Sequence, residues 1–223
     1  MSYPAFLKGK NIDYVIDNIL FSLRREKKNV ELLLKLATLY SVKNLHENSK
    51  KTFSKAIEID NEHVKKLAPK ILGKVYSAWR NLGVAYLEKD KFEDANACFE
   101  TALTINPDSV NDWHFYAKSY ERLKKFNKAV KAYEKAIRRG SDLLVSMLKM
   151  ANIYEDQGNY ELSQKMYSDS LEILNVMANS WDSLRRIYSE LGFEKQESIA
   201  KLKSLEIIKT KEKISAKLQI SKQ

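Results

Sequence analysis

The sequence predicts an all-α protein built from antiparallel helix pairs, and three observations support this prediction. Tyrosines recur at one constant interval, at Tyr86, Tyr120, Tyr154 and Tyr188, and we call this interval the period. The apolar residues around them are spaced by three and four, which places them on one face of a helix. The 223-residue chain contains only three prolines and six glycines, which suits a protein with few interruptions of its helices. A fixed internal period favours one array of repeats over two independent globular domains.

The clearest copy of the repeat ends at a proline. Its slots hold Trp79, Leu82, Gly83, Tyr86, Ala95, Phe99, Ala102 and Pro107. In the second half, the small residues Ala95 and Ala102 flank the large residue Phe99. This small-large-small order complements the large side chains of the first half, which predicts that the two helices pack as an antiparallel pair. Gly83 costs about 1 kcal/mol inside a helix relative to alanine, so we expect another backbone to approach it closely. Pro107 lies where the second helix should stop.

The same slots recur one period and two periods later. They hold Trp113, Tyr116, Ala117, Tyr120, Ala129, Tyr133 and Ala136, and then Met147, Met150, Ala151, Tyr154, Ser163, Tyr167 and Ser170. Trp181, Leu184 and Tyr188 open a further copy. This spacing resembles the W-x2-L-G-x2-Y…A-x3-F…P pattern of the tetratricopeptide repeat (TPR) family. The resemblance implies a right-handed superhelical solenoid of antiparallel helix pairs, with about four and a half to five repeats.

The repeat divides the chain into eight segments. They are a half-repeat or capping helix (1–29), a degenerate first repeat (30–63), a helical insertion (64–75), three repeats (76–109, 110–143 and 144–177), a fifth repeat with capping helices (178–209) and a basic tail (210–223). The first segment matches the second helix of a repeat, and it could pair with a second copy of the chain. The tail is either disordered or a binding segment, since Ile214, Leu218 and Ile220 have only weakly helical spacing.

The insertion makes the interval between Tyr40 and Tyr86 longer than the period. Its apolar residues stay in phase with the repeat that follows, which predicts one extended helix rather than a loop. Pro69 allows two interpretations: the helix kinks near Lys66, or it starts at Pro69. The insertion is either a partner site or a spacer.

Composition narrows the class of protein. The formal net charge of +10 is uneven: residues 1–75 carry 15 Lys and Arg against 8 Asp and Glu, residues 76–177 carry 14 against 15, and residues 178–223 carry 10 against 6. The best-formed repeats are therefore near neutral. No run approaches the roughly 18 apolar residues of a membrane span, and no secretory signal begins the chain, so we expect a cytoplasmic protein. The single cysteine, Cys98, is expected to be a small buried side chain.

No pattern of catalytic or metal-binding residues stands out. The sequence has no Gly-rich phosphate loop, no H-E-x-x-H and no paired cysteines, and His46, His63 and His114 share no metal-ligand spacing. Helix ends or turns are expected at Gly140, Gly158 and Gly192. We therefore expect a protein that is not an enzyme and needs no cofactor or metal.

The resemblance implies that first helices line a concave groove for an extended peptide or a partner's helix. The slots expected to face this groove hold Arg80, Asn81, Asn111, His114, Phe115, Lys118, Arg122, Lys149, Asn152, Asn179, Asp182 and Arg186. Such a groove would be mildly basic and rich in amide groups, which suits the backbone and the carboxylates of an acidic partner segment. The main interpretation is a protein-interaction scaffold or adaptor.

A second candidate surface, which is strongly basic, supports an alternative function in nucleic-acid binding. Its residues are Lys124, Lys125, Lys128, Lys131, Lys135, Arg138 and Arg139, on what would be the convex side of a second helix. Such a stripe could follow a phosphate backbone, as in a nucleic-acid-associated or ribosome-associated factor, or it could be a solvated helix face. Few aromatic residues remain outside the predicted core to stack on bases, which disfavours nucleic acid.

Overall fold

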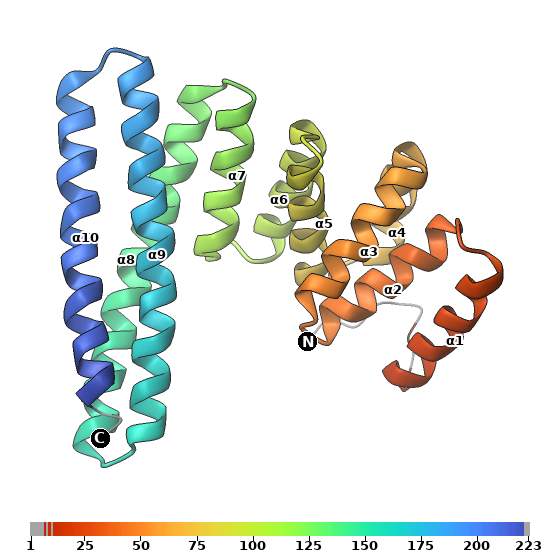
Figure 1. Ribbon diagram of the computed structural model, residues 1–223, viewed down its shortest axis with the longest axis horizontal. Helices are drawn as coiled ribbons and strands as arrows, with labels where there is room; N and C mark the ends of the chain where they lie inside the picture. The colour runs from red at the N-terminus through yellow and green to blue at the C-terminus, as the bar shows by residue number, and fades with distance from the viewer. Residues whose placement is uncertain (1–6, 8, 10, 221–223) are drawn as a thin grey trace. The chain divides into compact units, whose positions relative to one another are not determined.

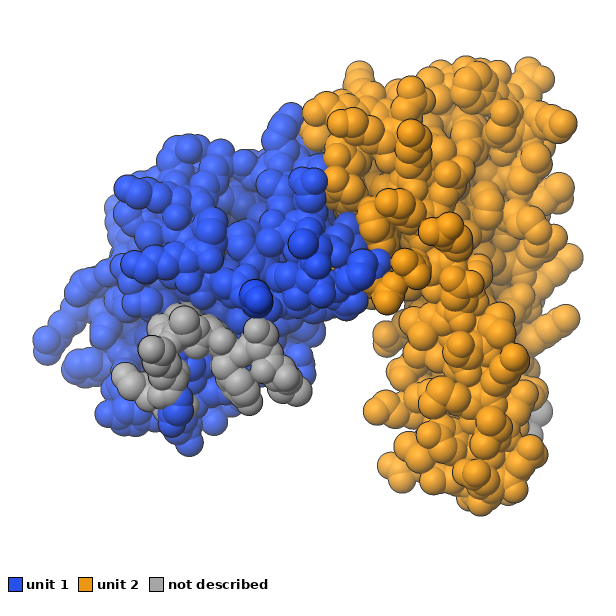
Figure 2. Space-filling view, turned by 180° about the vertical axis from the view of Figure 1, so that it is seen from behind, with its two compact units in different colours: residues 1–107 blue, residues 108–223 orange. Residues whose placement is uncertain are grey.

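The computed structural model describes residues 7, 9 and 11–220, which form α-helices and turns without a β-strand (Figure 1). The predicted all-α class is confirmed. The helices are α1 (Ile12–Arg25), α2 (Val30–Val42), α3 (His46–Ile59), α4 (Asn61–Leu72), α5 (Tyr76–Glu88), α6 (Phe92–Ile105), α7 (Val110–Arg122), α8 (Phe126–Asp156), α9 (Tyr160–Glu190) and α10 (Glu194–Ile220). They belong to two compact units, unit 1 (residues 1–107) and unit 2 (residues 108–223) (Figure 2).

Unit 1 contains two helix pairs of the predicted kind, α2 with α3 and α5 with α6. In the second pair, Tyr86 of α5 and Phe99 of α6 are both buried. A Cβ built on Gly83 would lie 2.9 Å from Cε1 of Phe99, so the close approach predicted at this glycine exists. The neighbour is the Phe99 ring, however, and not a backbone segment. The absence of a side chain at Gly83 leaves space for the Phe99 ring of the same repeat.

The turns inside the helix pairs share one backbone feature. A residue with positive φ follows the first helix in each: Asn44 (59°), Asp90 (55°), Lys124 (55°), Gly158 (70°) and Gly192 (72°). The last four stand one period apart, so the sequence period is also a period of backbone conformation. The turns predicted at Gly158 and Gly192 are confirmed.

Helix α4 corrects the prediction for the insertion. The predicted continuous helix is wrong, because α4 ends at Leu72, Gly73 follows with φ of 50°, and α5 begins separately at Tyr76. The start at Pro69 is also wrong, since α4 begins at Asn61 and holds Pro69 within its last turn. Its apolar stripe is buried against α2 and α3.

Helix α1 packs its apolar stripe against α2. Ile16 and Ile19 are buried beside Leu36 and Leu39. The aromatic side chains of Tyr14 and Phe21 point to solvent instead, and both are more than half exposed. Part of the predicted 1–29 segment, residues 1–6, 8 and 10, lies outside the described residues, and the predicted self-association stays a prediction.

Unit 2 corrects the predicted ends of its helices. Three long helices run side by side, α8 and α10 each against α9 (Figure 1). Helix α8 continues through Gly140, and α9 continues through Asn175, where the period predicts that one repeat ends and the next begins. Gly140 therefore lies inside a helix, where a Cβ would come within 2.7 Å of Cγ of Met177. The expected turn at Gly140 is wrong.

A single residue type explains why these boundaries differ from the one between α6 and α7. Pro107 separates α6 from α7, and the residues one and two periods later are Ser141 and Asn175. Both retain the backbone N–H that a helix needs, whereas proline does not. Because α8 and α9 run on, the space beside the first half of α8 is filled by Leu184 and Ile187 of α9.

The C-terminal segment is helical as far as α10 extends. Ile214 is buried in the core formed with α8 and α9, and Leu218 packs against that core. Much of the predicted 210–223 tail is thus ordered as part of α10. Residues 221–223, the end of that tail, lie outside the described residues.

Candidate functional site

The residues predicted for the groove belong to both units. Arg80 and Asn81 lie on α5 of unit 1, and the others lie on α7, α8 and α9 of unit 2. Each unit therefore has to be considered as a surface in its own right.

A cleft of about 430 Å³ lies beside Arg80 in unit 1, and we call it the Arg80 cleft. The start of α5, the turn after α2 and the start of α3 form its walls. The polar residues that line it include Asn44, His46, Lys74, Tyr76, Ser77 and Arg80. Nη2 of Arg80 donates to the Tyr76 hydroxyl over 2.5 Å, and the guanidinium carbon lies 5.0 Å from the centroid of that ring. The described residues lining this cleft include two cations, Lys74 and Arg80, and no carboxylate.

Asn81 does not face this cleft as an open ligand. Its side chain is buried, with 3% of its surface exposed, and its Nδ2 donates to Oγ of Ser41 over 3.0 Å. Nδ2 also lies 3.3 Å from Nδ1 of His46. The amide thus joins α5 to α2 and α3, and the expected exposure of Asn81 is wrong because the three helices converge at this slot.

In unit 2, most of the predicted groove residues on α7 and α9 are exposed. The exposed ones are Asn111, Lys118, Arg122, Asn179, Asp182 and Arg186, and Phe115 is half-buried. Nη2 of Arg186 lies 3.5 Å from Oε1 of Glu121, so this cation has a partner within the unit. Helices α7 and α9 pack against each other.

His114 packs inside unit 2 rather than facing a groove. Its Nδ1 lies 2.9 Å from Oγ of Ser180 on α9, and its ring centroid lies 5.4 Å from that of Tyr133 on α8. Burial lowers the pKa of His114 to about 4, and the positive charges of Lys118 and Arg186 contribute to the lowering. The imidazole is therefore neutral at pH 7.

Lys149 and Asn152 lie in the second half of α8, away from the other groove residues. Oδ1 of Asn152 accepts a hydrogen bond from the Tyr167 hydroxyl over 3.1 Å. At about 1.5 Å per residue, Asn152 lies roughly 28 Å along α8 from Tyr133, the residue beside His114. The continuous helix α8 thus separates residues that the repeat spacing predicts on adjacent helices.

Two lysines of the basic surface at the start of α8 contact aromatic rings of α7. Nζ of Lys135 lies 4.2 Å from the centroid of the Trp113 ring, and Nζ of Lys128 lies 5.6 Å from that of Tyr120. Arg139 forms an ion pair with Asp108 at 3.0 Å. Lys131 and Arg138 are exposed, and Lys124, Lys125 and Lys128 line a shallow cleft of about 280 Å³. These cations cover aromatic rings of their own unit as well as facing solvent.

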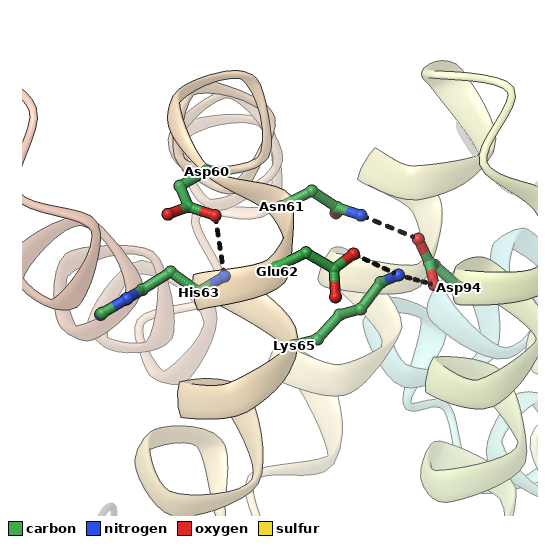
Figure 3. A network of polar contacts seen from close by, with 6 residues as sticks. All are labelled: Asp60, Asn61, Glu62, His63, Lys65 and Asp94. Atoms are coloured by element: carbon green, nitrogen blue, oxygen red, sulfur yellow. Dashed lines mark hydrogen bonds and ion pairs between the residues drawn. The ribbon is translucent and has the colours of Figure 1, made fainter.

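Sequence reasoning missed a third hollow, a cavity of about 340 Å³ between α4, α5 and α6. Trp79, Tyr86 and Cys98 are among the residues that line it. Lys65 of α4, which also lines it, forms an ion pair with Asp94 of α6 (Figure 3). We call it the α4–α6 pocket. The twelve-residue insertion in the sequence could have indicated this pocket, since the inserted helix α4 supplies one of its walls.

The described residues contain no group of three or more His, Cys, Asp or Glu arranged to hold a metal ion. Burial raises the pKa of the Cys98 thiol, and the charge of Asp94 raises it further, so the thiol is neutral and a poor nucleophile. In the part of the chain that the structure describes, no helix has the length and apolarity needed to cross a bilayer.

Unit 2 is expected to lose stability as the pH falls from about 6.5 to about 4. His114 binds a proton near pH 6.5 in the unfolded chain but only near pH 4 in the folded one. The unfolded state therefore binds more protons in this window, which costs up to about 3 kcal/mol. Urea unfolding of unit 2 at several pH values, compared with His114→Asn, measures the effect. Identical pH slopes for the two proteins would contradict it.

Two family models match segments of the chain, and both are described as tetratricopeptide repeat. One matches residues 76–109. The other matches residues 30–63, 113–139 and 145–173. The matched segments together cover more than half of the chain.

Comparison with curated proteins finds relatives that are much longer. Superkiller protein 3 of Schizosaccharomyces pombe is 26% identical over 134 residues, which is 57% of this chain and 10% of that protein. Anaphase-promoting complex subunit 3 of the same organism is 28% identical over 114 residues, or 51% of this chain and 15% of that protein. The chain thus spans at most 15% of the length of these two relatives.

Among solved structures, the crystal structure of MamA is similar to this chain at 23% sequence identity. The match covers 74% of this chain and 90% of MamA, with a TM-score of 0.37. A protein called YrrB, described as a TPR protein with an unusual peptide-binding site, matches at 15% identity over 85% of this chain and 91% of its own, with a TM-score of 0.34.

Proposed function

The chain belongs to the tetratricopeptide repeat family, and from this premise we propose that it is a non-catalytic scaffold that binds an acidic segment of a partner protein in the Arg80 cleft. Members of this family are generally protein-interaction scaffolds. One relative is named as a subunit of a larger complex, which is consistent with such a role. The proposal concerns the surface that performs this task here.

The charge of the Arg80 cleft is the observation that carries the proposal. Lys74 and Arg80 are the charged residues that line it, so its field is positive and favours carboxylates. The Tyr76 hydroxyl and ring hold the Arg80 guanidinium in place, which reduces the entropy that binding would cost. Asn44 and Ser77 add groups that can bond to a peptide backbone.

Apolar side chains of the cleft give a segment something to bury. Val42, Val75 and Ile105 line it, and Ile105 is partly exposed. A partner segment with carboxylates next to an aliphatic residue would satisfy both kinds of contact. The predicted groove residues on unit 2 remain candidates for a separate contact with the same partner.

The double variant Lys74→Glu with Arg80→Glu is expected to lower partner recovery at least tenfold in affinity purification with mass spectrometry, because it makes the cleft negative. The matched control is Lys51→Glu with Lys55→Glu, which changes the same charge on the exposed face of α3. Recovery of the same acidic proteins by all three forms would refute the proposal.

The alternative function, nucleic-acid binding, predicts a different outcome in the same affinity purification. Nuclease treatment should abolish recovery if the basic surface on α8 holds the partner through phosphates. Recovery should then also fall steeply between low and physiological salt and be lost on charge reversal of Lys128, Lys131 and Lys135. Nuclease-resistant recovery that survives this reversal would dismiss the alternative.

A further inference from the structure

The α4–α6 pocket has an apolar floor and a polar edge. Ala68, Trp79, Leu82 and Cys98 contribute apolar surface, and all four are buried. Pro69 of α4 and Ala97 of α6 also line the pocket and are exposed, so they mark its mouth. Its volume of about 340 Å³ falls within the range of small ligand sites.

Tyr86 lines this pocket, and its hydroxyl is a buried group without a hydrogen-bond partner. Only 2% of the side chain is exposed, and its oxygen forms no hydrogen bond. The other fully buried tyrosines differ: the Tyr133 hydroxyl donates to Oε2 of Glu121 over 2.6 Å, and that of Tyr167 donates to Asn152. An unpaired buried hydroxyl is costly, so a bound group that pairs with it would be stabilised.

A second unpaired atom belongs to Asn61, which bonds to Asp94 at the edge of the pocket but does not itself line the pocket. Nζ of Lys65 lies 3.0 Å from Oδ1 of Asp94 and 3.0 Å from Oε1 of Glu62. Nδ2 of Asn61 donates to Oδ2 of Asp94 over 3.2 Å, while its own Oδ1 is buried and accepts no hydrogen bond (Figure 3).

We propose that the α4–α6 pocket binds a tyrosine side chain from a peptide segment of a partner, with the tyrosine hydroxyl bonded to that of Tyr86. A phenol is apolar along its length and polar at its tip, which matches a largely apolar pocket lined by Tyr86, whose hydroxyl has no partner. A carboxylate is disfavoured because Asp94 and Glu62 lie near Tyr86. Phenylalanine would leave the Tyr86 hydroxyl unpaired.

This pocket depends on the insertion and not on the repeat. Lys65, Ala68 and Pro69 come from α4, which has no counterpart in the repeat pattern. The inserted helix thus has a binding role in addition to its packing on α2 and α3. The site uses none of the residues that line the Arg80 cleft.

Titration of the full chain with N-acetyl-tyrosine N-methylamide, followed by amide NMR shifts, tests the proposal against the phenylalanine analogue. We expect shifts confined to α4, α5 and α6, and about fivefold tighter binding of the tyrosine compound, the gain from one net hydrogen bond. In Tyr86→Phe the two compounds should bind equally. This variant should fold normally, because it removes a hydroxyl that has no partner, and its thermal midpoint provides the check.

A bulky side chain at the mouth of the α4–α6 pocket provides a second, independent test of the proposal. Ala97→Trp should block both compounds, whereas Thr104→Trp, an exposed position on α6 outside the pocket, should block neither. Equal binding of both compounds to the natural chain, no binding at millimolar concentration, or shifts outside these helices would overturn the proposal. Binding of free p-cresol without binding of the capped tyrosine would also overturn it, in favour of a small phenolic ligand. Lys74→Glu with Arg80→Glu should leave this titration unchanged, so failure here is distinguishable from failure of the Arg80 cleft.

Discussion

Gly83→Val is expected to destabilise unit 1 by about 3 kcal/mol, at the upper end of the usual cost of overpacking a core. A Cβ at this position would lie 2.9 Å from Cε1 of Phe99 and 3.2 Å from Cβ of Cys98. Phe99 is fully buried, so its ring has no open space to move into. The gain in helix propensity from replacing glycine, below about 1 kcal/mol, is smaller than this clash. Hydrogen exchange of the α5 and α6 amides measures the loss.

Two further variants show whether the Phe99 ring is the cause. Ala97→Val places a valine on the exposed face of α6 and should change stability by no more than about 0.5 kcal/mol. In a Phe99→Leu background, Gly83→Val should cost at least about 1 kcal/mol less than in the natural chain, because the two sites are coupled. A cost for Gly83→Val as small as that of Ala97→Val would show that α5 and α6 are not this close.

Ser141→Pro is expected to cost unit 2 about 3 kcal/mol, the usual penalty for proline inside a helix. Position 141 lies in the middle of α8, one period after Pro107. Proline there removes one helical hydrogen bond and places its ring against the preceding turn. Asn175→Pro should have a similar effect on α9. Circular dichroism and hydrogen exchange of α8 amides on both sides of residue 141 record the change.

If Ser141→Pro did not destabilise unit 2, the chain would have a repeat boundary at this position like the one at Pro107. If the chain turned near Gly140 as the period predicts, Ser141→Pro would be neutral or stabilising by about 0.4–1 kcal/mol, since proline restricts the unfolded chain. Ser141→Ala is the control, because it removes the side-chain hydroxyl and keeps the backbone N–H. It should be close to neutral in either case.

The sequence predicts the parts of this fold that depend on local pattern. The spacing of Trp79, Leu82 and Tyr86 identifies α5, and the small-large-small order around Phe99 identifies its partner α6. Gly158 and Gly192 correctly mark turns because their backbone needs a positive φ. These features are encoded within a single repeat, so one chain is enough to read them.

The parts that were mispredicted depend on contacts between distant segments. Gly140 looks like a turn residue, but it lies against Met177 of α9, a contact with a distant segment that no local spacing reveals. Asn81 occupies a slot that looks exposed, but Ser41, far earlier in the chain, receives its hydrogen bond. The unpaired Tyr86 hydroxyl was also invisible, because tyrosine fills the same slot in other repeats whether or not its oxygen has a partner.

The burial of Cys98 gives the natural chain a built-in reporter. It is the single cysteine of the sequence, it is 4% exposed, and burial keeps its thiol protonated. Because a protonated thiol reacts slowly, alkylation of Cys98 is slow in the folded protein and faster when unit 1 opens, so its rate reports the opening of unit 1. Because unit 2 contains no cysteine, this chemistry follows one unit without interference from the other.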